Sequence, residues 1–444
     1  MQLFSLVRIS RFIISLALAV TLLFVASSCD TSSPLSKETA ADGEVTLTVW
    51  AWAQDYNGKA MEIAQKYYSA EKPNVKVNIV TMPADEIVTQ MDTKFSSCDY
   101  KGLPDIVLIE DYRIQSYLQL FPGEIRALSP AVKPEDFMDC KTIISVYNGE
   151  LYGVPFDSGV ASLFYRTDYI EQAGFTKADM ENITWDRFIE IGKAVKEKTG
   201  KLMLALDPND LCQIKLMMQS AGQWYVNNDG KTINLADNQV LKDAIKTYIR
   251  IVNSGIALQV AGPGIENRAI NNGDLATVPT GTWRIPVLMN TTDEHTEKWA
   301  IAPIPRMAEA SGAVNASSLG GSGWYVIDKA ENADIAADFL AKTFASNLDL
   351  INELASEIYL VDTLKAAGSS PNYYKPNKTF SNQMILKDLF DWTLDVPPVN
   401  YGLYTHSIDS IIEYAVQLIM QGADIDESLQ NAQTIAESIQ VTAG

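Results

Sequence analysis

The sequence predicts an α/β protein in which mainly parallel β-sheets carry helices on their faces. Between residues 45 and 109, extended apolar runs alternate with amphipathic helical runs in the order strand, helix, strand, helix, strand, which is the pattern of a parallel sheet. Farther along, an extended run breaks at Asp157, Ser158 and Gly159 and then resumes. Such a break suits a chain that crosses between two domains, and 444 residues are enough for two or three domains.

Hydrophobic periodicity predicts the first five elements. Apolar residues alternate over 45–52 and 75–79, which predicts strands, and they recur at helical spacing over 60–67 and 87–95. The run 106–109 is continuously apolar, which is typical of a strand covered on both faces. Ligands of such sheets bind beyond the carboxyl ends of the strands. We therefore expect a site beside the polar and aromatic residues that follow the first and third strands.

The middle of the chain holds a turn followed by a break. Asn148-Gly149 is a strong signal for a two-residue hairpin turn, so we expect residues 143–147 to pair with 150–155. Two interpretations of the break at 156–159 stay open: a hairpin within one continuous sheet, and a crossover between domains that faces a cleft. In the second interpretation, Asp157 is either a ligand contact or a turn former.

A second set of strands and helices follows the break. Thr184 can cap a helix that ends at Gly200, and a strand at 273–279 runs into an aromatic loop at Trp283. A further strand and three helical stretches complete the chain, over residues 324–327, 335–354, 408–420 and 427–439.

The N-terminus reads as an export signal. Arg8 and Arg11 precede an almost wholly apolar run at 12–26, and small residues then lead into Cys29. A cysteine at this place resembles a bacterial lipoprotein signal, in which the thiol is lipidated and becomes the mature N-terminus. Such signals usually carry Leu where this chain has Ala26, so ordinary cleavage nearby stays an alternative. We expect residues 1–28 to be the signal peptide and 29–43 to be a flexible tether.

Composition narrows the kind of ligand. Without residues 1–28 the chain loses two arginines and no acid, so its formal charge moves from −20 to −22. This charge argues against nucleic acid or an anionic membrane surface as a ligand. Beyond Cys29 there are three cysteines at no zinc-binding spacing. Cys98 and Cys140 can pair, and free thiols are an equal alternative.

Several kinds of active site find no support in the sequence. His295 and His406 are the two histidines, so a multi-histidine metal site is excluded and a Ser-His-Asp triad would need one of them. Ser322 sits in a glycine-rich segment, but Trp324 stands where a nucleophile elbow needs glycine. Dinucleotide and phosphate-loop motifs are absent as well. The sequence therefore predicts no catalytic residue, no metal and no cofactor.

The aromatic residues favour a carbohydrate site instead. The chain has eight Trp and nineteen Tyr, several of them beside carboxylates and amides at predicted strand ends. Aromatic faces pack on the C–H face of a sugar ring, while carboxylates, amides and arginine hydrogen-bond its hydroxyls. For Trp52 and Trp283 a ligand contact and core packing are equal alternatives, whereas Trp185 and Trp299 lie in amphipathic runs typical of the core.

Ten segments of the chain together resemble a known family. They are residues 45–52, 73–77, 103–107, 149–165, 184–186, 222–224, 272–276, 281–283, 302–305 and 320–327. In this order they resemble the extracellular solute-binding proteins, family 1, which serve ABC sugar importers and include maltose-binding proteins. The resemblance spans essentially the whole mature chain.

This resemblance implies a two-lobe periplasmic-binding-protein fold of type II. Each lobe would be a mainly parallel sheet flanked by helices, with a sugar bound in the cleft between the lobes. Three interlobe crossings would fall at 156–159, near 318–323 and near 367–371. The expected N-lobe comprises residues 44–156 and 322–368, and the expected C-lobe comprises 157–321 and 369–444.

The resemblance also implies a set of ligand-binding residues. Tryptophans would stack on sugar rings, while aspartates and arginine would bind hydroxyls. Carried over by position, the set is Trp52, Gln54, Asp55, Asp111, Tyr112, Arg113, Asp157, Trp224, Trp283, Gly320, Gly321 and Tyr401.

The function that follows is capture of a sugar or oligosaccharide and its delivery to an ABC permease. The protein would be a monomer without catalytic activity, lipid-anchored at the cell membrane and facing the periplasm or cell exterior. One alternative keeps the fold and binds a polyol or polyamine. An alternative from another class is a secreted glycoside hydrolase that uses two of Asp55, Asp111 and Asp157.

Overall fold

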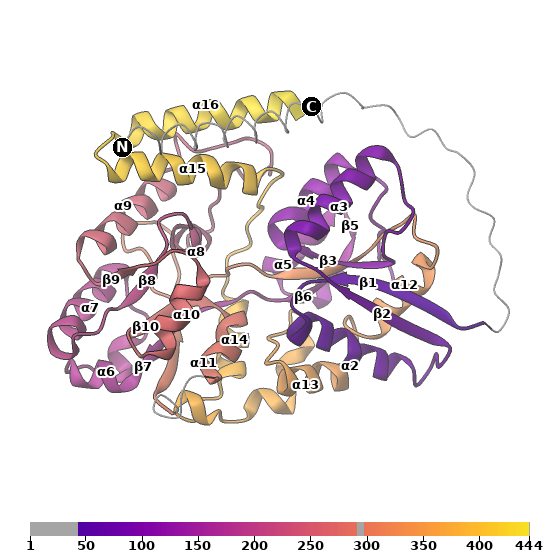
Figure 1. Cartoon of the computed structure of the whole chain (residues 1–444), viewed down its shortest axis with the longest axis horizontal. Coiled ribbons are helices and arrows are strands. Elements are labelled where there is room, and N and C mark those ends of the chain that lie inside the picture. Colours follow the sequence, from indigo (N-terminus) through magenta and orange to yellow (C-terminus); the bar gives the residue numbers. More distant parts are fainter. Residues whose placement is uncertain (1–42, 291–296, 444) are drawn as a thin grey trace.

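The computed structural model describes residues 43–290 and 297–443, which form two lobes that each surround a β-sheet (Figure 1). The expected signal peptide, the lipidated Cys29 and nearly all of the tether lie outside the described residues. Within the described ranges, no helix is long and apolar enough to cross a membrane.

The first lobe contains a five-stranded sheet in the order β2-β1-β3-β12-β6. Strands β1 (Val45–Ala51), β2 (Val75–Thr81) and β3 (Ile106–Glu110) are parallel, which confirms the predicted alternation of strands and helices. The apolar run of β3 is fully buried up to Glu110, as expected for a central strand. Strands β12 (Ser322–Val326) and β6 (Gly153–Asp157) complete the sheet.

The second lobe has the sheet order β10-β7-β11, with β7 (Ala161–Arg166) in the middle. Strands β10 (Thr277–Gly281) and β11 (Trp299–Pro303) are both antiparallel to β7. A parallel pair, β8 (Leu204–Leu206) and β9 (Ala257–Gln259), joins β10 through backbone hydrogen bonds such as Thr277 N–H to Met203 O.

The first sheet is mainly parallel, as predicted, because β2, β1, β3 and β6 run in the same direction and β12 runs against them. The prediction is wrong for the second lobe, because its sheet β10-β7-β11 is antiparallel. Strand β12 is antiparallel to β3 and to β6, and β7 is antiparallel to both of its neighbours. These two strands enter their lobes from the junction between the lobes. A strand that enters at the edge where its neighbours end must run in the opposite direction.

The predicted hairpin exists but is shorter than expected. Asn148 and Gly149 both have positive φ, 50° and 83°, and they join β4 (Val146–Tyr147) to β5 (Glu150–Leu151). The preceding residues belong to helix α5 (Asp139–Ser145). Farther on, β6 pairs with β12 rather than within the hairpin, because its buried apolar side chains belong to the main sheet.

The chain break at Asp157 separates the two sheets, so the interpretation as one continuous sheet is wrong. Two other segments pass the same junction. Ala161 N–H donates to Ser317 O and Leu319 N–H donates to Gly159 O, both at 2.8 Å. Asp157 also forms a β-bridge with Asp362. The exact lobe limits, 44–156 with 322–368 and 157–321 with 369–444, stay predictions.

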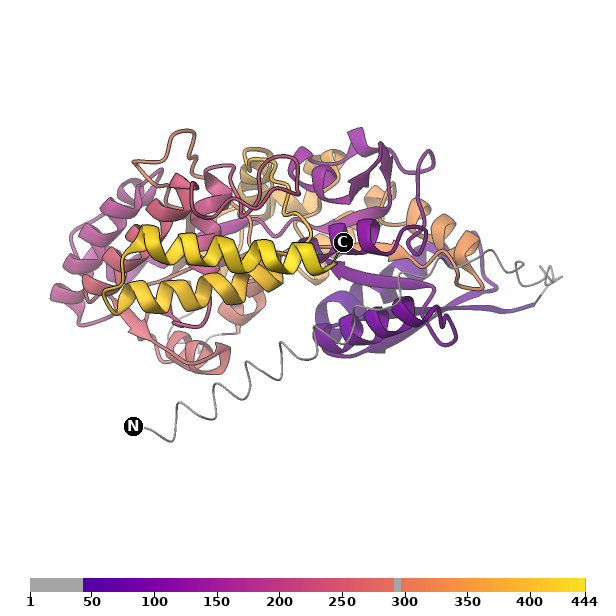
Figure 2. The same cartoon turned by 90° about the horizontal axis from the view of Figure 1, so that it is seen from above.

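Helices cover both sheets, and the last two lie side by side along the second lobe (Figures 1 and 2). Thr184 caps helix α7 by accepting the Arg187 N–H, and Gly200 ends it with a φ of 71°, as predicted. The α-helices of the first lobe are α2 (Lys59–Tyr68), α3 (Ala84–Ser97), α4 (Asp111–Leu120), α5, α12 (Ala333–Lys342) and α13 (Leu348–Glu357). The others are α6 (Thr167–Gln172), α7 (Trp185–Thr199), α8 (Cys212–Ser220), α9 (Gln239–Asn253), α10 (Pro263–Asn271), α11 (Ile285–Met289), α14 (Ile385–Leu394), α15 (Thr405–Met420) and α16 (Ile425–Ala443).

Two cysteines of the described chain carry free thiols, the buried Cys140 and the partly buried Cys212. The alternative in which Cys98 and Cys140 form a disulfide is therefore not the one that the structure adopts.

Candidate functional site

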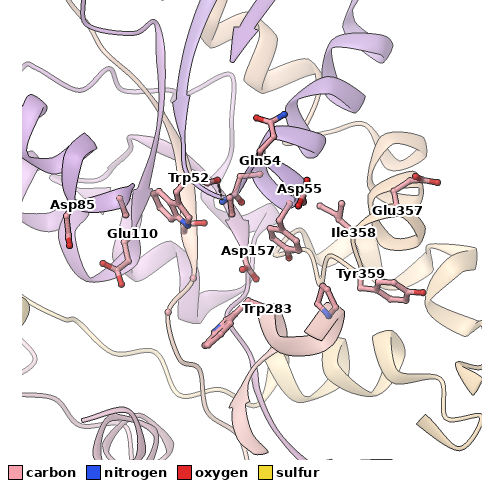
Figure 3. Close-up of a pocket in the computed structure, with 18 of the residues that line it drawn as sticks. Trp52, Gln54, Asp55, Asp85, Glu110, Asp157, Trp283, Glu357, Ile358 and Tyr359 are labelled. Atoms are coloured by element: carbon pink, nitrogen blue, oxygen red, sulfur yellow. Dashed lines mark hydrogen bonds between the residues drawn. The ribbon is translucent and has the colours of Figure 1, made fainter. Parts of the chain in front are cut away.

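A cleft of about 890 Å³ opens between the lobes at the carboxyl ends of their strands. The first lobe contributes the loop after β1, the start of α3, and the ends of β3 and β6; the second contributes the turn after β10 and the start of α15. In the view of Figure 3, Asp157 lies between Trp52 of the first lobe and Trp283 of the second. Eight of the twelve sequence-predicted residues line this cleft: Trp52, Gln54, Asp55, Arg113, Asp157, Trp283, Gly320 and Gly321.

The loop after β1 is shaped by a sharp change in the backbone. Ala53 is left-handed, with a φ of 54°, and a π-helical turn, Gln54–Gly58, follows it. The Asn57 amide donates to the backbone oxygen of Trp52 at 2.8 Å, which holds the backbone of the loop beside the cleft. Gln54 bonds instead to Thr81 and Glu62 within its own lobe. Gln54 therefore supports the loop, and Trp52 lines the cleft.

Trp283 presents the largest exposed aromatic surface in the cleft. It lies in the 3-10 turn Thr282–Arg284 after β10, and 40% of it is exposed. The Arg284 guanidinium lies 4.5 Å from the centre of the indole, and Arg284 is in turn held by Glu266 and by Asn267. By contrast, Trp185 and Trp299 are fully buried, as their amphipathic runs predicted.

Asp157 is a nearly buried carboxylate at the floor of the cleft. Its Oδ1 accepts the Gly159 N–H at 3.0 Å, and burial raises the pKa of its carboxyl group. The hydroxyl of Tyr56, another cleft residue, is buried and has no hydrogen-bond partner among the described residues. The Asp157 carboxylate offers an acceptor to a hydroxyl-bearing ligand, whereas the Tyr56 hydroxyl is buried away from the cleft surface.

The backbone of the junction is close-packed beside Asp157. A Cβ atom on Gly159 would lie 2.8 Å from Gly320 O, and one on Gly321 would lie 2.4 Å from an Asp111 carboxylate oxygen. Gly159, Gly320 and Gly321 also have positive φ angles. Glycine is therefore required where the crossing segments touch.

Four predicted residues, Asp111, Tyr112, Trp224 and Tyr401, are buried behind the cleft wall instead of lining it. Asp111 forms a buried ion pair with Lys141, and burial raises the pKa of the Asp111 carboxyl to about 6 although Lys141 opposes this. Tyr112 stacks on Trp224 and meets Tyr401 edge to face. These side chains shape the wall from behind in this conformation, so direct ligand contact is not what the structure presents for them.

The sequence prediction missed several residues that line the cleft. Glu110 ends β3 and could have been found by the strand-end rule, whereas His406 has no local signal beyond the rarity of histidine in this chain. Others depend on tertiary placement alone: Tyr56, Asp85, Glu357 and Tyr359.

The cleft wall combines exposed indole with an excess of hydrogen-bond acceptors. Arg113 is the arginine of the wall, and its acidic members are Asp55, Asp85, Glu110, Asp157 and Glu357. Among the described residues, no group of three or more His, Cys, Asp or Glu could hold a metal ion. The chemistry suits reversible binding of a neutral polyhydroxylated ligand.

Comparisons with known proteins give the same answer as the geometry. The sequence matches the profile of a family described as bacterial extracellular solute-binding protein over residues 62–379. It is 42% identical over 405 residues to the lactose-binding protein of Rhizobium radiobacter, and this alignment covers 91% of this chain and 95% of that protein. It is 24% identical over 413 residues to the arabinooligosaccharide-binding protein of Halalkalibacterium halodurans, and this alignment covers 89% of this chain and 90% of that protein.

A solved structure resembles this fold along nearly its whole length. The galacto-N-biose-/lacto-N-biose I-binding protein of an ABC transporter from Bifidobacterium longum matches with a TM-score of 0.73. The identity is 18%, and the match covers 91% of this chain and 99% of that one. This likeness confirms the two-lobe periplasmic-binding-protein fold.

Proposed function

This chain belongs to the bacterial extracellular solute-binding proteins, which are binding components of ABC transporters and not enzymes, and we propose that it captures a short saccharide in the interlobe cleft. The observation that carries the proposal is the position of Trp52 and Trp283 on opposite lobes, with the Asp157 carboxylate between them (Figure 3). A sugar ring presents apolar faces and a rim of hydroxyls, which fits this arrangement.

We propose lactose as the first ligand to test. The relative with 42% identity over most of both chains is a lactose-binding protein, and a second relative binds arabinooligosaccharides. A cleft of about 890 Å³ has room for a saccharide of more than one ring. In this assignment Trp52 and Trp283 stack on sugar rings, while Asp55, Arg113 and Asp157 hydrogen-bond the hydroxyls.

The glycoside hydrolase alternative is not supported, because the family to which this chain belongs consists of binding proteins. A polyamine is the alternative that a specific feature favours, since acids outnumber arginine in the cleft wall. A polyol would use the same hydroxyl partners as a sugar but would offer no flat ring face to the indoles. The first experiment therefore compares these ligand classes directly.

The proposed location and partners follow from the family and from the N-terminal sequence. An extracellular solute-binding protein is exported and passes its ligand to a membrane-embedded permease. The small residues before Cys29 support cleavage at that cysteine and lipidation of its thiol. The folded part would then work as a tethered monomer outside the cytoplasm. Labelling with a radioactive fatty acid, and its loss in Cys29→Ala, would test the anchor.

Titration calorimetry of residues 30–444 tests the ligand assignment. Lactose, galactose, maltose, sorbitol and spermidine are the probes, and chromatography afterwards shows whether the sugar is intact. In a thermal-unfolding measurement, lactose at about a hundred times its Kd should raise the free energy of unfolding by about 2.7 kcal/mol. Binding of intact lactose supports the proposal. If spermidine were the one probe that gave a heat of binding, the ligand would be a polyamine and not a saccharide. The absence of binding by any sugar would contradict the proposal.

A further inference from the structure

A small second cavity lies in the first lobe beside the cleft. It has a volume of about 20 Å³ and is lined by residues of α3, β3 and α4 and by the loop after β1. We call this cavity the side pocket. Its lining comes from the first lobe, so its walls do not depend on the second lobe. The residues that line both the side pocket and the cleft are Trp52, Ala84, Glu110 and Arg113.

The wall of the side pocket is mostly apolar. Its apolar members include Trp52, Ile87, Val88, Met91, Leu108 and Ile109. Tyr117 also lines the side pocket, but its hydroxyl already donates to the Asp92 carboxylate. A cavity of this size is large enough for a water molecule, yet a buried water needs about two to four polar partners. An apolar group about the size of a methyl therefore suits the side pocket better than water does.

Two charged residues, Glu110 and Arg113, stand where the side pocket meets the cleft, since they line both. Burial opposes ionisation of Glu110, but the hydrogen bond and charge of His406, followed by the charge of Arg113, hold the pKa of Glu110 below its usual range. Glu110 Oε2 lies 2.9 Å from His406 Nε2. Arg113 is 3.6 Å from Glu110 and 3.7 Å from Asp85. A carboxylate and a guanidinium have more acceptor and donor sites than these contacts use, so both can also bind a ligand.

We propose that the side pocket binds the methyl of an acetamido group, so that the protein prefers a saccharide with an N-acetylhexosamine unit over the same saccharide without the acetyl group. An acetamido group has an apolar methyl end and, next to it, an N–H donor and a C=O acceptor. With the methyl in the side pocket, the N–H donates to Glu110 and the C=O accepts from Arg113. A hydroxyl at the same ring position has no apolar atom to place there. This inference rests on the saccharide function proposed above and narrows its ligand.

Titration calorimetry with matched pairs of sugars tests the proposal. N-acetyllactosamine is compared with lactose, and N-acetylgalactosamine with galactose. At least one acetamido sugar should bind about fourfold or more tightly than its parent, which is the contribution of one buried methyl.

A filled side pocket should remove this preference. Val88→Ile adds one methylene to the wall of the side pocket, and Val88 does not line the cleft. The variant should therefore lose the gain from the acetyl group and keep its affinity for lactose. Val252→Ile is the matched control, because Val252 is a partly buried helical valine, in α9, that lines neither cavity. Val88→Leu is a second filling variant in case Val88→Ile does not fold.

The outcomes separate the side pocket from the saccharide function. If each acetamido sugar bound no more tightly than its parent, the inference would fail and the saccharide function would stand. A gain for 6-deoxygalactose over galactose, with none for the acetamido sugars, would overturn the acetamido assignment. A gain that persisted in Val88→Ile would place the acetyl group elsewhere and would also overturn the inference. If no sugar bound, the inference and the saccharide function would fail together.

Discussion

The phenol ring of Tyr112 lies on the indole of Trp224, with ring centres 5.4 Å apart and planes inclined by 22°. The two residues come from different lobes of the predicted division. Trp224 is fixed from the other side by a hydrogen bond from its Nε1 to the Thr405 hydroxyl at 2.9 Å. Two residues predicted to bind ligand therefore bind each other and join the lobes.

Replacement of Tyr112 by alanine should lower the free energy of unfolding by about 3–5 kcal/mol, because it empties a buried aromatic site. Tyr112→Phe keeps the stack and loses the hydroxyl that accepts the Gly320 N–H at 3.2 Å, so it should cost about 1 kcal/mol. Urea denaturation of the ligand-free protein measures both values. A cost below about 1 kcal/mol for Tyr112→Ala would mean that the stack contributes little to the fold.

Trp283→Ala should weaken lactose binding by at least about tenfold, since an aromatic contact with a ligand contributes on the order of 1 kcal/mol or more. Its 40% exposure predicts little change in the melting temperature. Tyr414→Ala is the matched control, because Tyr414 is 57% exposed and does not line the cleft. Calorimetry with lactose compares the two variants. Equal affinities would remove Trp283 from the site.

The sequence could predict the strand ends that form the cleft, because alternation and helical spacing are local signals. Trp52 and Trp283 were found in this way. The choice of Asp111 over Glu110 shows the limit of the method. Adjacent residues at a strand end point to opposite sides, so Glu110 lines the cleft while Asp111 turns inward to Lys141. Which side faces the cleft is set by distant parts of the chain.

The same limit explains the other differences. His406 lies 296 residues after its partner Glu110 in the sequence and reaches the cleft through the packing of α15 against α4. The direction of β7 depends on the path between lobes, which has no signature in the strand itself. The turn at Asn148-Gly149 fixed the centre of the hairpin, but the length of pairing was decided by the main sheet, which takes β6.

Asp362 should make the fold less stable as the pH rises. It is 1% exposed, and burial, reinforced by the charge of Asp157, raises its pKa from 3.8 to about 7. A carboxyl whose pKa is raised in the folded state stabilises the fold below its unfolded pKa, and this contribution is lost as the pH rises through the folded pKa. The window therefore runs from about pH 4 to pH 7, in which stability should fall.

Asp362→Asn tests this dependence, because an asparagine Oδ1 can still accept the Leu364 N–H, now 2.7 Å from Asp362 Oδ1. The variant should melt roughly 2–4 °C higher than the unsubstituted protein at about pH 8. Its melting temperature should also vary less between about pH 5 and pH 8. Parallel pH profiles for the two proteins would show that Asp362 does not titrate in this range.

The buried pair of Lys141 and Asp111 should be the costliest polar contact to break. Both side chains are 3% exposed, and Lys141 also donates to Asp157 O at 2.8 Å, beside the crossing. Lys141→Met would leave the Asp111 carboxylate buried without its cation, at a cost of about 3–5 kcal/mol.

Urea denaturation should show this loss and its recovery in the double variant Lys141→Met/Asp111→Leu, since replacing both partners removes the unpaired charge. Lys66→Met is the matched control, because Lys66 is 62% exposed in its pair with Glu353. An exposed pair contributes about 0–1 kcal/mol. If Lys141→Met cost no more than Lys66→Met, Asp111 would be taking up a proton at little cost, and its pairing with Lys141 would not be what holds the crossing in place.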